Sequence, residues 1–390
     1  MKFIFDGPKN ASKSLYNRAL IVQSLFPQLM LIGNSTSDDV KNMKAAVHAV
    51  THGGEVPCGA AGTVFRFIAL RCAREKGAFR LTATERLMER PQDDLVVILD
   101  QLGVRCQLLA NGAFIQSEGW KKSLNPLQIP RSASSQFASG LLLSAWSLPF
   151  DLEFDLVGAA VSDGYWQMTL QFVQDMGMNV QVQGYGVKVP KEQSLKKLEY
   201  QLEPDMSSAF AIAAAGALMG EAQIHGYSEF SLQPDSTFVE ILRAMGAQCS
   251  QEGSVLTVRK PSQLKGRPVN LTDRPDLFPV LAVVAAFAEG VTELYGAPHL
   301  KSKESNRIQK TSELLTLMGV ENHPHETGML IHGLGANFKL HSIVFDPDKD
   351  HRMAMAAGLA RLKGFQIEIT DEAAVDKSFP DFWKTLRGEP

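Results

Sequence analysis

Basic residues recur beside Ser, Asp or Glu at a few points in a chain whose formal net charge is only −3. These basic residues are Lys13, Arg18, Arg90, Lys303, Arg307, Arg352 and Lys377. Guanidinium groups bind phosphate and carboxylate through paired hydrogen bonds, and a lysine supplies a point charge. Their concentration in a nearly neutral protein predicts a small substrate that carries several negative charges.

Two carboxylates lie beside these cations. Asp276 comes just before an apolar run, and Glu304 stands between Lys303 and Arg307. A carboxylate among cations is held ionised or tuned for proton transfer. We therefore predict acid–base chemistry at this pair, with a salt bridge or a helix cap as the alternative for each residue.

Six segments are apolar on nearly all sides after a small or polar opening, which predicts six buried helices. Their openings are Ser14, Gly62, Ser134, Ser207, Asp276 and His351. A helix N-terminus presents free N–H groups and partial positive charge to an anion. A Ser there can simply cap its helix, but six openings turned into one cleft would form an anion-binding site.

Histidines gather near a predicted hairpin, at His323, His325 and His332. No Cys or carboxylate spacing around them makes a zinc motif, so we interpret them as a surface loop and predict no metal. The sequence also contains no G-x-x-x-x-G-K-[ST] phosphate loop and no dinucleotide fingerprint.

Between the buried helices lie amphipathic stretches that each end at a glycine, the residue that most easily adopts the left-handed conformation of a helix end. These glycines are Gly103, Gly177, Gly246 and Gly319. Alternating hairpins follow, with turns at Asn111-Gly112, Gly184, Glu252-Gly253 and Thr327-Gly328. The sequence therefore predicts an α/β fold whose repeat is helix, strand, helix, hairpin.

The spacing of the six openings predicts a sixfold repeat in two domains. Successive openings are 69 to 75 residues apart, except for the first interval of 48 residues from Ser14 to Gly62. We therefore expect the first repeat to be truncated, with no hairpin between residues 51 and 58. Three repeats form each domain, one from residues 13–203 and a discontinuous one from residues 1–12 and 204–390. A single large sandwich with chance periodicity is the alternative.

Composition excludes several other classes. The balance of 39 basic and 42 acidic residues disfavours a nucleic-acid binder. Neither a secretory signal nor an apolar run of bilayer length is visible, which predicts no membrane partner. The cysteines Cys58, Cys72, Cys106 and Cys249 are scattered in or beside apolar segments, typical of buried free thiols. We expect a cytoplasmic monomer.

Motifs along nearly the whole chain resemble the enolpyruvyl transferases, and within them the branch that acts on shikimate 3-phosphate. They are the segments 11–19, Ala61-Gly62-Thr63, Glu89-Arg90-Pro91, Ser134-Ser135-Gln136-Phe137, Pro275-Asp276, Lys303-Glu304-Ser305-Asn306-Arg307, residues 350–355 and residues 377–381. Eight motifs in order make a chance similarity very improbable. The resemblance implies two three-repeat domains joined by a hinge.

The resemblance also implies two substrates and a role for each site residue. Shikimate 3-phosphate would be held by Lys13, Ser14, Arg18, Ser134, Ser135, Gln136, Ser162, Tyr165, Asp276 and Lys303. Phosphoenolpyruvate would be held by Lys13, Gly62, Arg90, Gln136, Arg307, Arg352 and Lys377. Asp276 would be the base, Glu304 the proton donor, and Lys13 and Lys303 would assist. No cofactor is implied.

The chain departs from the family pattern at several positions. Ala60 replaces a usual Asn and Phe67 a usual Pro, which removes a polar contact near the expected phosphoenolpyruvate site. Asp163-Gly164 replaces a common Lys-Pro, and His299 stands where an Asn is frequent. These changes put affinity and inhibitor sensitivity in doubt more than the type of reaction.

Two alternatives remain open. The sister transferase that acts on UDP-N-acetylglucosamine carries Lys-Asn near its N-terminus and usually a Cys before the Arg, whereas this chain has Lys13-Ser14 and no Cys from Thr82 to Arg90. A non-catalytic relative that senses a phosphorylated metabolite would need the cations, but it would not need Asp276 and Glu304.

Overall fold

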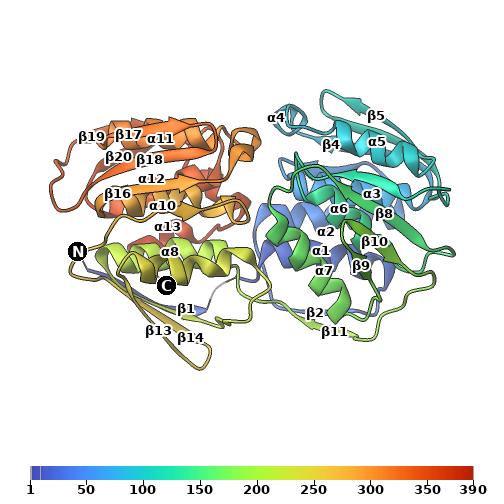
Figure 1. The fold of residues 1–390 in the computed structure, drawn as a ribbon, viewed down its shortest axis with the longest axis horizontal. Helices are drawn as coiled ribbons and strands as arrows, with labels where there is room; N and C mark the ends of the chain where they lie inside the picture. Colours follow the sequence, from blue (N-terminus) through green and yellow to red (C-terminus); the bar gives the residue numbers. More distant parts are fainter. Residues whose placement is uncertain (1, 9, 390) are drawn as a thin grey trace. The chain divides into compact units, whose positions relative to one another are not determined.

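Short helices and strands alternate along the chain in the computed structural model, which describes residues 2–8 and 10–389 (Figure 1). The helices are α1 (Lys13–Leu25), α2 (Asp38–His52), α3 (Gly62–Ala73), α4 (Glu85–Met88), α5 (Asp93–Gln101), α6 (Gln136–Leu143), α7 (Asp163–Asp175), α8 (Met206–Met219), α9 (Phe238–Ala244), α10 (Phe278–Ala286), α11 (Arg307–Leu317), α12 (His351–Leu362) and α13 (Phe382–Arg387), with 3₁₀ turns η1 (Pro234–Thr237), η2 (Pro275–Leu277), η3 (Pro298–Ser302) and η4 (Glu372–Lys377). The strands are β1 (Phe3–Pro8), β2 (Met30–Ile32), β3 (Val56–Gly59), β4 (Lys76–Ala83), β5 (Arg105–Leu109), β6 (Gly112–Glu118), β7 (Leu127–Pro130), β8 (Leu152–Val157), β9 (Gln181–Gln183), β10 (Gly186–Val189), β11 (Glu199–Gln201), β12 (Gly220–His225), β13 (Gln248–Glu252), β14 (Val255–Arg259), β15 (Val269–Asn270), β16 (Glu289–Tyr295), β17 (Asn322–His325), β18 (Gly328–Leu334), β19 (Ser342–Phe345) and β20 (Gln366–Ile369). The predicted α/β class is confirmed.

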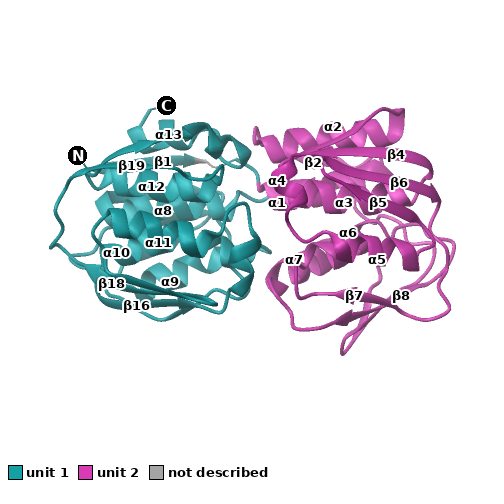
Figure 2. Cartoon of the chain, turned by 90° about the horizontal axis from the view of Figure 1, so that it is seen from above, with its two compact units in different colours: residues 1–11, 203–390 teal, residues 12–202 magenta. Residues whose placement is uncertain are grey.

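The chain divides into two compact units (Figure 2). Unit 2 contains Ser12–Leu202, and unit 1 combines Met1–Ala11 with Glu203–Pro390. The first strand therefore belongs to the unit built by the second half of the chain, where β1 pairs in parallel with β12. Strand β11, the last one before the chain passes back into unit 1, belongs to unit 2 and pairs in parallel with β2.

Four sheets share one strand order and one set of directions. In each, the first strand runs parallel to the second, which then pairs with an antiparallel hairpin. Unit 1 contains β1-β12-β14-β13 and β15-β16-β18-β17, and unit 2 contains β3-β4-β6-β5 and β7-β8-β10-β9. The remaining pairs, β11-β2 and β19-β20, have two strands each.

The two-stranded sheets are the places where the hairpin is missing. After α2, Gly53 and Gly54 lead straight to β3, which pairs with β4 and not with another strand in residues 51–58. The predicted absence of a hairpin here is confirmed for the described residues. The expectation of a full sixth repeat is wrong: the described residues after β20 form η4 and α13, because Phe379 and Phe382 bury there against the core.

Three apolar helices form the centre of each unit. In unit 1, α8, α10 and α12 contact one another and lie side by side (Figure 1). In unit 2, α1, α3 and α6 make the equivalent contacts. Two predicted openings lie slightly outside their helices, because α6 begins at Gln136, after Ser134, and Asp276 lies in η2, before α10. The N-terminal ends of these helices carry about half of the predicted site residues.

The glycines that end the amphipathic helices have the positive φ angles that the sequence predicts. The angles are 73° at Gly103, 106° at Gly177, 101° at Gly246 and 76° at Gly319. Side chains other than Gly rarely adopt this conformation, so these positions stop the helices and direct the chain into the following hairpins.

The cysteines and the helix lengths bear on two further expectations. All four cysteines are free thiols; Cys58 and Cys72 are buried, while Cys106 and Cys249 are partly exposed, so the expectation of full burial is wrong for these two. Among the helices described, none combines the length and the apolar character that crossing a bilayer requires.

Candidate active site

Arg307 forms the centre of a charged cluster in unit 1. Its guanidinium is 1% exposed and donates from Nη1 to Asp276 Oδ1 at 2.8 Å and from Nη2 to Glu304 Oε2 at 3.0 Å. Its Nε donates to Asp350 Oδ2 at 2.8 Å. One arginine at the start of α11 thus joins the two carboxylates that the sequence singles out.

Three more predicted cations complete this cluster. Arg352 Nη2 donates to Asp276 Oδ2 at 3.1 Å, and Lys303 Nζ lies 3.8 Å from Asp276 Oδ1. Lys377 Nζ lies 3.8 Å from Glu304 Oε1. All six site residues predicted in unit 1 are therefore assembled, and each carboxylate is in contact with at least two cations.

The cluster holds Asp276 and Arg307 in their ionised forms. Burial raises the pKa of Asp276, but the fields of Arg352, Lys303 and Arg307 outweigh burial and lower its pKa well below the usual value. Burial lowers the pKa of Arg307, but Asp350, Glu304 and Asp276 raise it well above the usual value. Asp276 is thus a carboxylate at neutral pH.

Sequence reasoning missed Asp350, which supports the cluster from the start of α12. Its fully buried carboxylate accepts from Ser305 Oγ at 3.0 Å and caps α12 by accepting from the Arg352 N–H at 2.9 Å. An Asp directly before an apolar helix is a cap signature in the sequence. Its link to Arg307, 43 residues away, is not visible there.

A second missed pair lies at the start of α8. Ser207 Oγ donates to the buried carboxylate of Asp235. Burial, together with the neighbouring charge of Asp276, raises the pKa of Asp235 to about 6. The nearby His299 has the opposite shift: burial and the charge of Lys303 lower its pKa to about 3, so its imidazole is neutral at neutral pH.

Arg18 is a buried cation of unit 2. Its Nε donates to Thr169 Oγ1 at 2.7 Å, and its two Nη atoms donate to the carbonyl oxygens of Ser14 at 2.9 Å and Tyr165 at 3.0 Å. Burial lowers its pKa to about 9, which leaves it charged at neutral pH. These acceptors are all neutral, so the hydrogen bonds position the guanidinium without cancelling its charge.

Lys13 and Gly62 present two other predicted contacts of unit 2. Lys13 Nζ, at the start of α1, forms a 2.9 Å ion pair with Asp39 of α2. At the start of α3, a Cβ on Gly62 would lie 3.1 Å from Arg90 Nη1. The absence of a side chain at Gly62 therefore lets the Arg90 guanidinium lie against the helix N-terminus.

Gln136 is held by residues of α3. Its Oε1 accepts from Arg66 Nη1 at 2.9 Å, and its Nε2 donates to Thr63 Oγ1 at 2.9 Å. The same arginine donates to Gln92 Oε1 at 3.1 Å and to the Pro91 carbonyl at 2.9 Å. Arg66, which the sequence analysis does not select, thus joins the segment that follows Arg90 to the start of α6.

The remaining predicted residues of unit 2 lie in turns before helices or in a first helical turn. Ser134 Oγ accepts from the Gln136 N–H at 3.2 Å, and Ser135 is buried. Ser162 has φ 54° and ψ 39°, a left-handed conformation that is uncommon for serine and marks a constrained turn into α7. Tyr165 follows in the first turn of this helix.

Residues 47–386 match the family described as EPSP synthase (3-phosphoshikimate 1-carboxyvinyltransferase). The chain belongs to this family. Among curated members, the 3-phosphoshikimate 1-carboxyvinyltransferase of Mannheimia haemolytica is 30% identical, with 96% of this chain and 94% of that protein covered. The enzyme of Archaeoglobus fulgidus with the same name is 31% identical over the same shares of the two chains.

Solved structures support the fold of this EPSP synthase family member. An EPSP synthase from Acinetobacter baumannii has a TM-score of 0.76 at 22% identity and covers 99% of this chain and 96% of its own. The enolpyruvyl transferase NikO from Streptomyces tendae has a TM-score of 0.74 at 14% identity. The match covers 98% of this chain and 94% of NikO. Because differently named transferases share this fold, the fold alone does not select the acceptor.

One departure from the family pattern has a clear structural role. The Phe67 ring is fully buried, and the Arg18 guanidinium carbon lies 5.3 Å from its centroid. A cation over an aromatic face is attracted to it. A Cβ on Gly140 of α6 would come within 3.1 Å of this ring, so the glycine provides room for Phe67.

Proposed function

We propose that this chain transfers the enolpyruvyl group of phosphoenolpyruvate to the 5-hydroxyl of shikimate 3-phosphate and releases phosphate. The observation that carries the proposal is that Arg307 hydrogen-bonds both Asp276 and Glu304. A protein that only binds anions has no need of two carboxylates among its cations. The transfer needs one base and one acid.

Shikimate 3-phosphate is proposed to bind through cations, hydroxyl groups and a carboxylate. The binding residues proposed are Lys13, Ser14, Arg18, Ser134, Ser135, Gln136, Ser162, Tyr165, Asp276 and Lys303. The retained charge of buried Arg18 supports phosphate binding there, because buried cations bind anions strongly where water competes little.

Phosphoenolpyruvate carries a phosphate and a carboxylate, and the proposal assigns them several cations. The proposed ligands are Lys13, Gly62, Arg90, Gln136, Arg307, Arg352 and Lys377. Arg307 and Arg352 are almost fully buried, which favours fixed guanidinium forks over mobile surface charges.

The proposed chemistry assigns the proton transfers to the two carboxylates. Asp276 takes the proton from the 5-hydroxyl, whose oxygen attacks C2 of phosphoenolpyruvate while Glu304 gives a proton to the methylene carbon. The resulting tetrahedral intermediate then returns a methyl proton to the Glu304 carboxylate and expels phosphate, which takes the proton held by Asp276, to form the enolpyruvyl ether. Lys303 and Lys13 support the developing charges.

The low pKa of Asp276 makes it a weak base before substrate binds. Arg352, Lys303 and Arg307 cause this lowering. When substrate anions bind to these cations, their negative charge offsets the same fields and raises the pKa of Asp276 again. Anion binding and the activation of the base are therefore coupled in this proposal.

Release of inorganic phosphate from phosphoenolpyruvate tests the function directly. We expect phosphate release only when shikimate 3-phosphate is present, together with a product that contains both substrates' carbon skeletons. Release with UDP-N-acetylglucosamine instead would favour the sister transferase. Tight binding of shikimate 3-phosphate without turnover would favour the sensor.

Three broader features belong to the same proposal. We propose that the functional domains are residues 13–203 and residues 1–12 with 204–390, as the repeat spacing predicts. We further propose a monomer that acts on small molecules and not on nucleic acid. Its four free thiols suit the reducing cytoplasm, where we expect it to work.

A further inference from the structure

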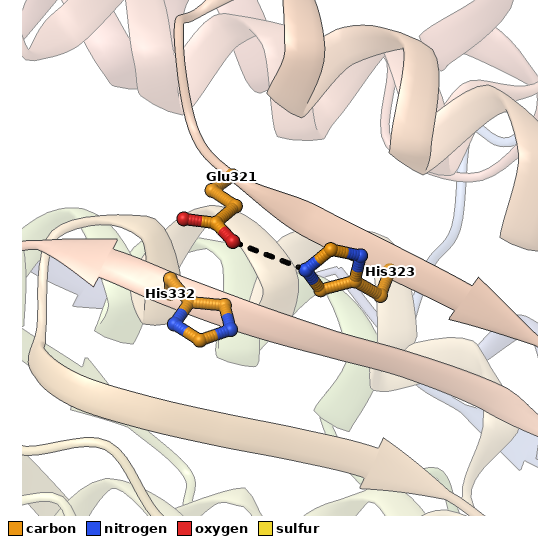
Figure 3. A group of neighbouring side chains, drawn as sticks. All are labelled: Glu321, His323 and His332. Carbon is orange, nitrogen blue, oxygen red and sulfur yellow. Dashed lines mark hydrogen bonds and ion pairs between the residues drawn. The ribbon is translucent and has the colours of Figure 1, made fainter.

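Glu321, His323 and His332 bring three metal-binding side chains together in unit 1. Their donor atoms lie within 4.8 Å of one another (Figure 3). His323 Nε2 is already 3.2 Å from Glu321 Oε1, and the two imidazole rings are 5.6 Å apart between centroids at an interplanar angle of 87°. The sequence predicts a surface loop here, beside a hairpin. That expectation is wrong, because His323 and His325 lie in β17 and His332 lies in β18.

The strand register explains why the three side chains share a face. Asn322 pairs with Ile331, and the His332 N–H donates to the Glu321 carbonyl at 2.9 Å, so Glu321 and His332 lie directly opposite each other. His323 is two residues from Glu321, and side chains two apart on a strand point to the same side of the sheet. Ile331 is buried on the other side. The cluster thus stands on a paired hairpin and not on a loose loop.

We propose that Glu321, His323 and His332 form a binding site for a divalent first-row transition ion, with Zn²⁺ as the expected occupant. Two imidazole nitrogens and one carboxylate oxygen form a donor set that zinc uses in proteins, with a fourth position open to water. Zinc–ligand bonds of about 2.0–2.2 Å place neighbouring tetrahedral donors roughly 3.4 Å apart. The side chains therefore need only rotamer adjustments to close around an ion.

Exposure sets the strength and the accessibility of this site. The side chains of His323 and Glu321 are 62% and 67% exposed, and His332 is half-buried. An ion can therefore reach the donors without opening the fold, and its open position remains hydrated. We expect binding in the micromolar range, with Cu²⁺ binding more tightly than Zn²⁺, as the general order of these ions dictates.

The site lies away from the charged cluster and can brace the same unit. Helix α11 begins at Arg307, and its 11 residues span roughly 16 Å before the turn that leads to Glu321. An ion held by Glu321 and His332 joins the segment after α11 to β18. Because only the folded hairpin presents all three donors, Zn²⁺ is expected to raise the midpoint of thermal unfolding.

The test uses the full chain without a polyhistidine tag and Zn²⁺ alone as the probe. His48 and His52 on α2 are stacked with ring centroids 4.2 Å apart and could chelate an ion by themselves, so both are replaced by Gln in the parent and in every variant. Equilibrium dialysis then compares this parent with His323→Gln and His332→Gln. The matched control is His325→Gln, on the same strand but outside the donor set.

We expect each of the two variants to lose at least about ten-fold in Zn²⁺ affinity, because loss of even an outer partner of a ligand costs 10–100-fold. The control should stay within two-fold of the parent. With Cu²⁺, the electron paramagnetic resonance spectrum should show coupling to two nitrogens in the parent and to one in either variant. Unchanged Zn²⁺ affinity in both His323→Gln and His332→Gln would overturn the proposal. Equal unfolding midpoints in EDTA would establish that the variants are folded.

Discussion

Arg307 and Asp350 form a two-pronged ion pair inside unit 1. Arg307 Nε lies 2.8 Å from Asp350 Oδ2, and its Nη2 lies 3.2 Å from Oδ1. Both side chains are almost completely buried. The remaining guanidinium edge is left to Asp276 and Glu304, so Asp350 determines which way Arg307 presents its charge.

Replacing Asp350 by Ala should destabilise the protein by about 3–5 kcal/mol, because removing one partner leaves a buried charge poorly compensated. The loss of the α12 cap adds to this cost. Urea denaturation measures the free energy of unfolding. Glu368→Gln, at an exposed position of β20, should change it by less than about 0.5 kcal/mol. A cost below 1 kcal/mol for Asp350→Ala would mean that Arg307 does not depend on this pair.

Replacing Glu304 by Gln should lower turnover by roughly 10²–10⁴-fold, the usual contribution of a general acid. The amide keeps the size and hydrogen-bonding capacity of the acid but cannot deliver its proton. Shikimate 3-phosphate should still bind within a few-fold of the parent affinity. Steady-state phosphate release and calorimetric titration measure the two quantities.

Glu313→Gln is the matched control for that experiment, because Glu313 lies on α11, the helix that follows Glu304, and pairs only with Lys310 at 2.8 Å among the interactions described for it. If Glu304 only anchors Arg307 and Lys377, its amide variant will lose little activity and bind phosphoenolpyruvate more weakly. Near-parental turnover would eliminate Glu304 as the acid.

Replacing Arg18 by Lys should weaken binding of shikimate 3-phosphate by at least ten-fold, or about 1.4 kcal/mol. An ammonium cannot satisfy Thr169, Ser14 and Tyr165 and also present a fork to phosphate. Isothermal titration checks the affinity. The control is Arg80→Lys, because Arg80 is an exposed arginine that donates to Asn111. This variant should leave the affinity for shikimate 3-phosphate unchanged. Equal affinities for the two variants would show that Arg18 is structural.

Replacing Asp235 by Asn should make stability less dependent on pH. The pKa of Asp235 rises from 3.8 to about 6 on folding, so the folded chain holds this proton more tightly than the unfolded chain. The stabilisation that comes from protonated Asp235 is therefore lost as the pH rises from about 4 through 6. The groups facing it are Ser207, Asp205, Asp276 and Arg352.

At each pH, we compare the free energy of unfolding of Asp235→Asn with that of the parent. Between pH 4 and pH 7 the parent should lose roughly 2 kcal/mol of stability relative to the variant. Chemical denaturation at several pH values measures this difference. A constant difference across that range would mean that Asp235 is ionised throughout.

Much of the fold could be predicted because its signals are local. A helix followed by Gly319, or a hairpin turning at Thr327-Gly328, is encoded within a few neighbouring residues, and the structure has both. The missing first hairpin was equally visible, since a 48-residue interval leaves no room for it. Local signals failed for residues 372–387, where helical segments bury Phe379 and Phe382 in place of a hairpin.

The candidate site was only partly predictable. The sequence indicates Asp276, Glu304 and Arg307 because charge is unusual beside an apolar helix. It does not indicate Asp235, whose importance depends on burial near Asp276, or Arg66, which acts through Gln136, 70 residues away.

By itself, the sequence determined where the central apolar helices of this protein lie to within a few residues, that they are buried, and that cations and carboxylates occur near their openings. These are properties of neighbouring residues and of short-range periodicity. Only the tertiary structure decided that Asp350 would orient Arg307, that Phe67 would lie beneath Arg18, and that Glu321 would meet His323 and His332 across a hairpin. Such partners are set by strand register and helix packing, in which residues distant in the chain are brought within bonding distance by burial of the core.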